Sequence, residues 1–235
     1  MSLTLFPVIG VGEITVGTDL VEVMLTALDA QGESLRDGDV VAVSSKVVAK
    51  SEGRVVAIES GERAKVDLVE REARRVIRRR GPLRITETQH GFVCANSGID
   101  LSNTDEGTAV LLPLDPDRSA RRFRADVRRR RQVEVGVIVT DTFGRAWRHG
   151  VTDVAIGCSG VLAVLDLRGT PDANGRILEA TEVAIADEIA SAVNLVLAKS
   201  AATPFGIVRG LDPRLLGEGS IADDVVRTPD QDLFR

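Results

Sequence analysis

The stretch VEVGVIVTDTFGRAWRH (Val133–His149) combines a buried-strand pattern with a cluster of polar residues. It begins with mostly apolar and β-branched residues, which predict a buried strand over Val133–Val139. The chain then turns polar, with Thr140, Asp141 and Thr142 in succession. Ligands of open α/β proteins bind beyond the carboxyl ends of strands, so we expect these side chains to belong to a site.

The residue types after this strand suit a metal–phosphate site. A carboxylate beside a hydroxyl supplies the oxygen ligands that Mg²⁺ or Mn²⁺ prefers. Arg145 and Arg148 have guanidinium groups that match phosphate or carboxylate oxygens, and Gly144 makes the segment flexible. The alternative is a strand that ends in a salt-bridged turn, and these residues alone do not decide between the two.

Length and composition indicate a globular chain without a membrane segment. The chain has 235 residues, 43% hydrophobic and 28% charged, which suits one domain over residues 1–235 that can divide into two intimate lobes. No apolar run reaches the roughly 18 residues that a bilayer span needs, and the N-terminus has no signal-peptide pattern, so we expect a cytoplasmic protein. Cys94 and Cys158 are far apart and are expected to be buried free thiols.

Basic residues are concentrated in two segments. Residues 63–80 hold 8 Lys/Arg against 3 acids and residues 118–131 hold 8 Arg against 1 acid, so together they carry +12 and the rest of the chain −17. Such segments suggest nucleic acid, but they lack interleaved aromatic residues and their apolar residues recur at helical spacing. We therefore expect two amphipathic helices, over residues 64–80 and after Asp115-Pro116, whose outer faces are solvated or salt-bridged.

Strands and helices alternate along the chain, which predicts an α/β or mixed α+β fold. Further strands are expected at residues 3–9, 40–43, 83–88, 110–114, 154–165 and 203–211. Further helices are expected from Thr18 or Asp19 to Ala30 and, as a long, nearly all-apolar and central helix, at Glu179–Lys199. The polar stripe of that long helix (Asp187, Ser191 and Asn194) is expected to face a ligand or a second subunit. The tail from Asp212 is expected to be loop-like.

Two other polar segments resemble ligand loops. Ser44, Ser45, Lys46 and Lys50 follow the strand at residues 40–43 and could hold phosphates, although no P-loop motif is present and a polar edge strand is the alternative. The segment from Asn96 to Asn103 could offer a carboxylate to a metal and an amide to a base, or form an ordinary Asx turn.

Taken together, these segments resemble the coenzyme F420 gamma-glutamyl ligase family, which adds glutamate to a deazaflavin coenzyme precursor. The matching stretches follow the family's order through nearly the whole chain: PVIGVGEITVGTDL (7–20), DGDVVAVSSKVVAKSEGR (37–54), GIDLSN (98–103), VTDTFGRAWRHGVTDVAIGCSGV (139–161), EATEVAIADEIASAV (179–193) and VRG (208–210). Gly12 stands where relatives carry proline, a change that removes no functional group.

The resemblance implies a reaction and a set of ligands. It implies that GTP activates the carboxylate of a lactyl phosphate side arm as an acyl phosphate, which L-glutamate then attacks to give an amide, GDP and phosphate. It also implies two divalent ions (Mg²⁺ or Mn²⁺), with a monovalent cation such as K⁺ as a further option. The implied fold is a family-specific ligase fold with mixed sheets, in an intertwined homodimer and without the fused C-terminal reductase domain of some relatives.

The resemblance also implies roles for individual residues. The GTP-binding positions are Val11, Gly12, Glu13, Ile14, Ser45, Lys50 and Asn103. Asp100 and Asp141 match one metal site, and Thr142 matches a second. Arg145, Arg148 and His149 have no assigned role and are candidates for the acidic substrates.

Two other functions remain as alternatives. The first is an ATP- or GTP-dependent ligase that joins another amino acid to another acid. The second is a non-catalytic nucleotide- or RNA-binding protein that uses the two arginine-rich segments, which predicts steeply salt-dependent binding. The −17 charge of the rest of the chain argues against the second alternative.

Overall fold

The computed structural model describes residues 2–101, 107–197 and 203–234. A five-stranded mixed sheet forms its centre, in the order β1 (Thr4–Val8), β12 (Phe205–Arg209), β2 (Val40–Ser44), β8 (Gly136–Arg145) and β9 (Arg148–Ser159). Strands β2 and β8 are parallel and the other neighbours are antiparallel. The apolar runs at residues 40–43 and 135–139 are almost fully buried in this sheet, as their composition predicts.

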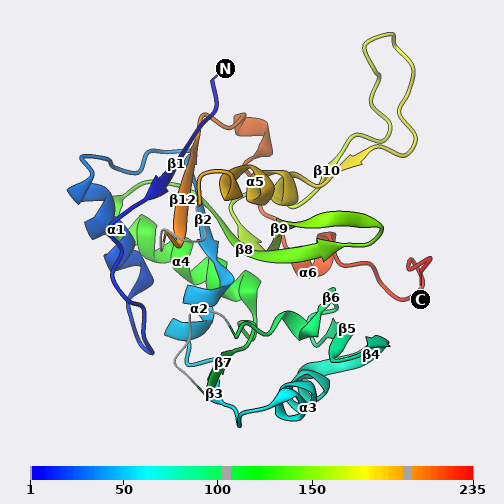
Figure 1. The fold of residues 1–235 in the computed structure, drawn as a ribbon. Coiled ribbons are helices and arrows are strands. Elements are labelled where there is room, and N and C mark those ends of the chain that lie inside the picture. The colour runs from blue at the N-terminus through cyan, green and yellow to red at the C-terminus, as the bar shows by residue number, and fades with distance from the viewer. Residues whose placement is uncertain (1, 102–106, 198–202, 235) are drawn as a thin grey trace.

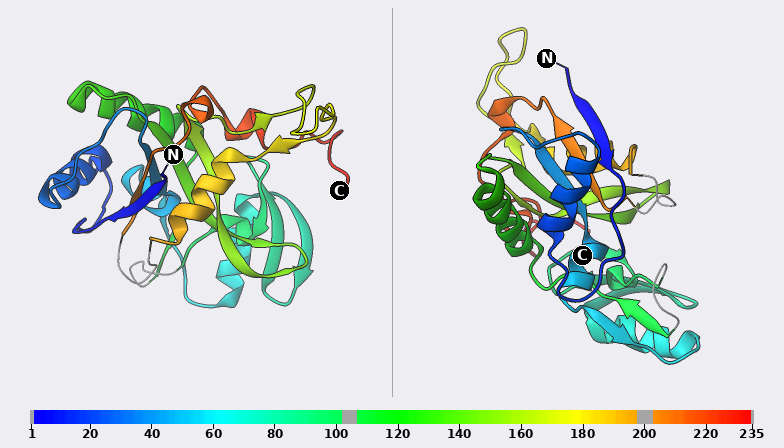
Figure 2. Two further views of the ribbon diagram at one scale, coloured as in Figure 1. Left: turned by 90° about the horizontal axis from the view of Figure 1, so that it is seen from above. Right: turned by 90° about the vertical axis from the view of Figure 1, so that its left-hand side faces the viewer.

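Helices cover both faces of the central sheet (Figure 1, Figure 2). Phe205 contacts Phe123 of α4 (Pro116–Arg131), with ring centroids 6.1 Å apart. The next residue, Gly206, faces α5 (Ile185–Asn194), where an added Cβ would lie 2.5 Å from Val193. Because successive residues of a strand point to opposite faces, α4 and α5 pack on opposite sides of the sheet. Helix α1 (Leu20–Ala30), capped by Asp19, packs beside α4.

A smaller unit lies below the central sheet in the view of Figure 1. It consists of α3 (Glu62–Glu72), the antiparallel sheet of β4 (Ala73–Arg80), β5 (Leu83–Thr88) and β6 (Val93–Ala95), the pair β3 (Val55–Ala57) and β7 (Thr108–Val110), and the short helix η1 (Asn96–Gly98). Leu68, Ala109 and Leu111 form a hydrophobic cluster of their own here.

Short elements complete the described chain. Helix α2 (Ser45–Ser51) follows β2 directly. The pair β10 (Leu165–Asp166) and β11 (Glu182–Val183) flanks a turn at residues 171–177, and η2 (Pro213–Leu215) and α6 (Ile221–Asp224) lie in the tail that was expected to be loop-like. Helix α6 begins at the buried carboxylate of Asp117, which accepts hydrogen bonds from Ser220 Oγ and from the backbone N–H groups of Ile221 and Ala222. None of the helices in the described ranges is long and apolar enough to cross a lipid bilayer.

The first basic segment is not one helix. Helix α3 ends at Glu72 and the chain continues as β4, which pairs with β5 from Ala73↔Thr88 to Arg80↔Leu83. Glu87 of β5 binds Arg74 and Arg75 of this strand, at 3.3 and 2.9 Å. Strand pairing and these ion pairs therefore outweigh the helical spacing of the apolar residues.

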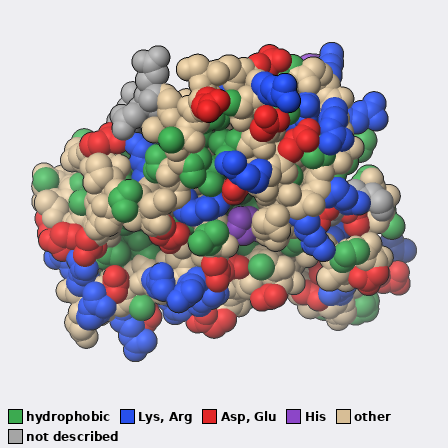
Figure 3. All heavy atoms as spheres, turned by 90° about the horizontal axis from the view of Figure 1, so that it is seen from below, with side chains coloured by type: hydrophobic (Ala, Val, Ile, Leu, Met, Phe, Trp, Pro, Cys, Tyr) green, Lys and Arg blue, Asp and Glu red, His purple; other side chains and the backbone are tan. Residues whose placement is uncertain are grey.

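The second basic segment is the expected helix, and its face is salt-bridged as predicted. Asp115 caps α4 by accepting from Arg118 N. Arg124 binds Glu218 at 2.7 Å and Arg128 binds Glu134 at 2.8 Å. Figure 3 shows Lys and Arg side chains intermingled with Asp and Glu on the face that it presents.

Four other expected boundaries are wrong. The strand expected at residues 154–165 begins earlier and ends earlier, as β9 (Arg148–Ser159), because its first half pairs with the polar half of β8. The long helix at Glu179–Lys199 is the ten-residue α5, because Glu182–Val183 pairs with β10; residues 198 and 199 lie outside the described residues. The strand expected at residues 110–114 is β7, which ends at Val110 opposite Val55. The strand expected at Val133–Val139 starts at Gly136 and runs on to Arg145, because its polar half pairs with β9. Cys94 and Cys158 are buried and free, as expected.

Candidate functional site

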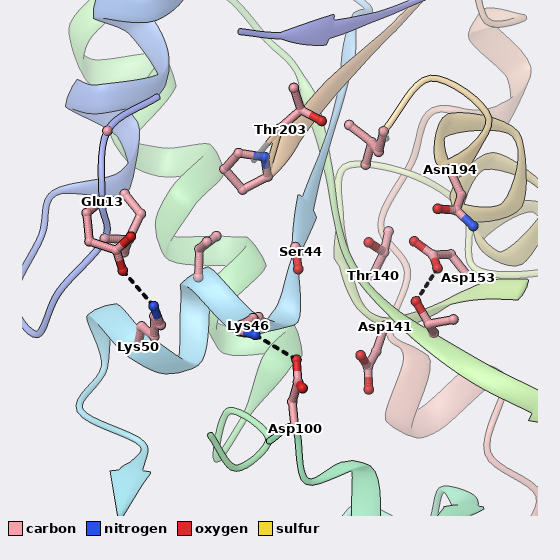
Figure 4. A pocket seen from close by; sticks show the side chains of 16 residues that line it. Glu13, Ser44, Lys46, Lys50, Asp100, Thr140, Asp141, Asp153, Asn194 and Thr203 are labelled. Carbon is pink, nitrogen blue, oxygen red and sulfur yellow. Dashed lines mark hydrogen bonds and ion pairs between the residues drawn. The ribbon is translucent and has the colours of Figure 1, made fainter. Parts of the chain in front are cut away.

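A cavity of about 310 Å³ opens at the end of β2, where Ser44 lies opposite Thr140 of β8 and α2 begins (Figure 4). It draws residues from five parts of the chain: Gly12–Ile14, the end of β2 with α2, Asp100, the β8–β9 hairpin, and the region around α5 and β12. The parallel pair brings Ser44 and Thr140 opposite each other. The cavity lies beside the polar residues that follow the apolar halves of these strands; that it binds a ligand stays a prediction.

Helix α2 directs two lysines into the cavity. Lys46 Nζ lies 2.9 Å from Asp100 Oδ2, and Lys50 Nζ lies 2.7 Å from Glu13 Oε1. The hydrogen bond and the charge of Lys50 lower the pKa of Glu13. The side chains of both lysines are mostly buried. Each ammonium group is therefore held in place as a positive charge at the wall of the cavity.

The β8–β9 hairpin contributes the opposite, acidic wall. Asp141 accepts a hydrogen bond from Ser45 Oγ at 3.1 Å. Burial, together with the neighbouring charges of Asp153 and Asp100, raises the pKa of Asp141 to about 7. The Thr142 hydroxyl donates a hydrogen bond to Asp153 Oδ1 at 2.6 Å. The carboxylates of Asp141 (β8), Asp153 (β9) and Asp100 (after η1) therefore line the same cavity and are close enough to influence one another electrostatically.

The structure gathers most of the predicted site residues. Of those predicted to bind GTP or metal, Gly12, Glu13, Ile14, Lys50, Asp100, Asp141 and Thr142 line this cavity. Val11 precedes the first of them, and Ser45 touches the site through Asp141. Asn103 lies outside the described residues. The roles assigned to these residues stay predictions.

Asp153 is a site residue that the sequence reasoning missed. It lies on β9 directly opposite Thr142, is 6% exposed and lines the cavity. Residues 151–156 alternate polar and apolar residues only in part, so this pattern alone does not indicate that Asp153 faces the site. The pairing of VTDTFGR with RHGVTDV across a tight turn is the signal that would place Asp153 there. Lys46 stood in the predicted phosphate segment, but its contact with Asp100 was not foreseen.

The polar stripe predicted on the long helix does face the site region. Asn194 lines the cavity. Asp187 accepts from Ala155 N at 2.9 Å, and Ser191 Oγ donates to the backbone oxygen of Asp153 at 2.8 Å. Burial raises the pKa of Asp187. Two members of the stripe therefore bind α5 to β9, and the third reaches the cavity.

The arginines of the Val133–His149 stretch are not among the residues that line the cavity. Arg145 and Arg148 pair with each other at the closed end of the hairpin, and Arg145 donates to the backbone oxygen of His149 at 3.0 Å. The polar residues Thr140–Thr142 also lie within β8 rather than in a loop, because they pair with residues 153–155 of β9. The hairpin thus moves the guanidinium groups away from the carboxylates that precede them.

The donor set of the cavity fits hard divalent cations. Carboxylates and a threonine hydroxyl are the oxygen ligands that Mg²⁺ and Mn²⁺ take. In the described part of the chain no three Asp, Glu, His or Cys side chains are arranged as a ready cage for a metal. That arrangement is compatible with Mg²⁺, which usually binds through one or two carboxylates together with substrate phosphates and water.

Comparison with known proteins points to one family. Residues 9–210 match the family model described as F420-0:Gamma-glutamyl ligase. A protein of Methanopyrus kandleri named coenzyme F420:L-glutamate ligase is 41% identical over 237 residues, which cover 93% of this chain and 92% of that protein. Its namesake in Archaeoglobus fulgidus is 39% identical over 100% of this chain and 97% of its own length, and that of Methanothermobacter thermautotrophicus is 35% identical over 100% of both.

Proposed function

We propose that this chain, which belongs to the F420-0:Gamma-glutamyl ligase family, joins L-glutamate to the deazaflavin coenzyme precursor in a GTP-dependent reaction. The observation that carries the proposal is the family match over residues 9–210, supported by relatives whose names state the same ligase activity. The cavity adds residues of the types that such a reaction needs.

The proposed reaction has two steps. An oxygen of the lactyl carboxylate attacks the γ-phosphorus of GTP, the bond to the β-phosphate oxygen breaks, and GDP leaves. The amine of L-glutamate then attacks the carbonyl carbon of the acyl phosphate, the bond to phosphate breaks, and the amide forms as the amine loses its proton. Phosphoryl transfer of this kind depends chiefly on positioning and on positive charge near the migrating phosphate.

The charges of the cavity wall support a requirement for divalent cations. Among the described residues, four carboxylates (Glu13, Asp100, Asp141 and Asp153) and two lysines (Lys46 and Lys50) line it. A triphosphate placed here would meet a wall that is itself net negative, which is unfavourable at short distance. Divalent cations held by Asp100, Asp141 and Thr142 would supply the missing positive charge and stabilise the charge on the phosphates.

The chain's own residues have separable tasks in this proposal. Lys50 and the backbone of Val11–Ile14 bind the nucleotide phosphates, and Ser45 holds Asp141 in place through its hydrogen bond. Lys46 neutralises Asp100 until substrate enters. We also expect a homodimer, which light scattering of the purified chain would detect.

A ligase assay tests the proposal. Purified chain is incubated with the coenzyme precursor, L-glutamate, Mn²⁺ and either GTP or ATP, and products are read by mass spectrometry. We expect a glutamylated coenzyme and GDP with GTP, loss of both with Asp141→Asn, and no loss with Glu188→Gln, which changes an exposed acid of α5. Absence of glutamylated product from the wild-type chain with either nucleotide would refute the proposed function. Product with ATP alone would refute the proposed dependence on GTP.

A further inference from the structure

Thr142 and Asp153 form a hydrogen-bonded pair at the wall of the cavity. Neither phosphoryl transfer nor amide formation, as proposed, requires Asp153 in this pair. They are register partners on β8 and β9, and the Thr142 hydroxyl donates to Asp153 Oδ1 at 2.6 Å. Both line the cavity, and Asp153 is 6% exposed. Figure 4 labels Asp153 on the opposite side of the view from Lys46 and draws a dashed line from its carboxylate.

The direction of this hydrogen bond fixes what the threonine can do. A hydroxyl group has one proton and two lone pairs, and an ionised carboxylate can only accept. Because the O–H of Thr142 is engaged in the hydrogen bond to Asp153, the oxygen of Thr142 has only lone pairs left for a further partner. A hydroxyl oriented in this way repels other acceptors that carry no proton and attracts cations.

The backbone around Asp153 is held in place from the other side. Ser191 Oγ of α5 donates to the backbone oxygen of Asp153 at 2.8 Å and lies 3.0 Å from Thr152 Oγ1. The carboxylate is thus attached to a strand that a helix fixes, and it is not on a mobile loop. Groups that orient metal ligands are usually built in this supported way.

We propose that Asp153 is a positioning residue for a divalent cation: it accepts the hydrogen bond of the Thr142 hydroxyl and so leaves the lone pairs of the Thr142 oxygen free to bind the cation. This inference rests on the proposed function, because that function brings a divalent cation to Thr142. Asp153 acts through Thr142 and does not need to touch the cation or the substrates.

A purely structural role fits the burial of Asp153 poorly. A buried carboxylate whose side chain binds one neutral hydroxyl in the described structure destabilises the fold relative to an uncharged group of the same shape. We therefore expect Asp153→Asn to raise the melting temperature of the metal-free chain, whereas a carboxylate that mainly supports the fold would give a lower one.

A Mn²⁺ titration of the whole chain tests the inference. Free Mn²⁺ is followed by electron paramagnetic resonance in the presence of GDP, for the wild type, Thr142→Val, Asp153→Ala and the double variant. We expect each single variant to weaken Mn²⁺ binding about 10- to 100-fold. The double variant should bind about as weakly as either single variant, since both changes remove the same ligand.

Two matched variants guard the test against loss of folding. Thr142→Ser keeps a hydroxyl at the same position and should retain Mn²⁺ affinity, and Glu188→Gln changes an exposed acid of α5 and should do the same. Unchanged affinity in Asp153→Ala would overturn the inference, as would losses that add in the double variant, because Asp153 would then bind the cation independently. No Mn²⁺ binding by the wild type would also overturn it.

The outcome is separable from that of the ligase assay. If the wild-type chain binds Mn²⁺ with the expected coupling between Thr142 and Asp153 but forms no glutamylated product, the proposed function fails and the positioning role stands. If product forms but the coupling is absent, the proposed function stands and the positioning role fails.

Discussion

Lys50 of α2 and Glu13 of the segment after β1 hold each other across the mouth of the cavity, with Nζ 2.7 Å from Oε1. The carboxylate is 75% exposed, whereas the lysine side chain is 17% exposed. The ammonium group is therefore the fixed partner, and an incoming phosphate can replace the exposed carboxylate without moving α2.

Replacing Lys50 by Met should weaken binding of GDP and GTP. A hydrogen bond to a charged group contributes about 1.5–3 kcal/mol, which corresponds to roughly a 10- to 150-fold rise in the dissociation constant. Isothermal titration calorimetry in the presence of Mg²⁺ measures the dissociation constant of each nucleotide. The control, Glu13→Gln, removes the competing carboxylate and should leave affinity equal or higher; a loss as large as that of Lys50→Met would contradict this role of the ammonium group.

The metal-free protein should lose stability as pH rises through the acid range because of Asp141. Its pKa is about 7 in the folded state and 3.8 ordinarily, so between about pH 4 and 7 the folded chain holds a proton that the unfolded chain releases. The free energy of unfolding contributed by this group therefore falls as pH rises across that window.

Thermal unfolding in EDTA at several pH values measures this dependence. Asp141→Asn cannot titrate and should remove this part of the slope, with a higher melting temperature than the wild type at pH 7.5. Glu188→Gln, the exposed control, should keep the wild-type slope. A wild-type slope in Asp141→Asn would show that the carboxyl group does not titrate in this range.

Arg209→Met should destabilise the central sheet strongly. Arg209 donates to both oxygens of Asp39, at 3.0 and 2.8 Å, and Asp39 is 1% exposed. Removing the guanidinium leaves a buried carboxylate without its charged partner, which costs about 3–5 kcal/mol. Urea unfolding measures the loss.

Two further variants identify the cause of that loss. The double variant Arg209→Met/Asp39→Asn should be less destabilised than Arg209→Met, because the buried charge is gone. Arg214→Met, which breaks the exposed pair with Asp212, should change stability little. If Arg214→Met were as harmful as Arg209→Met, burial of the carboxylate would not be the explanation.

Gly157→Ala should destabilise the contact between β9 and α4. An added Cβ would lie 2.3 Å from the backbone carbon of Pro116 and 2.7 Å from Asp117 N, so the helix would have to move. Overpacking of this kind costs about 1–3 kcal/mol. Gly144→Ala, in the same hairpin with no heavy atom within 4 Å of the new methyl, should unfold at nearly the wild-type urea concentration; equal losses would point to strand entropy instead of the clash.

The sequence predicts the position of the site better than its construction. Apolar strands at residues 40–43 and 135–139 are evident from composition, and their parallel pairing puts polar residues together at one edge. Nothing within VTDTFGRAWRH distinguishes a loop from one arm of a hairpin, because the outcome depends on pairing with residues 148–155. Asp153 could not be assigned for the same reason, since its contact with Thr142 exists only across that pairing.

The arginine-rich segment illustrates a second limit. Arginine is a good helix former, and the apolar residues of 64–80 recur at helical spacing, yet Ala73–Arg80 is a strand. The deciding contacts come from β5, whose Glu87 binds Arg74 and Arg75. Local propensity contains no information about a partner strand, so tertiary pairing overrides it.

The position of β12 between β1 and β2 has a consequence for synthesis of the chain. Residues 205–209 occupy the second place in the central sheet, so β1 and β2 have no common neighbour until these residues have left the ribosome. Until then the apolar edge of β2 stays open to pairing with other nascent chains. The complete central sheet, and the cavity with Thr203 and Pro204 in its lining, can therefore form only after residues 203–209 have been synthesised.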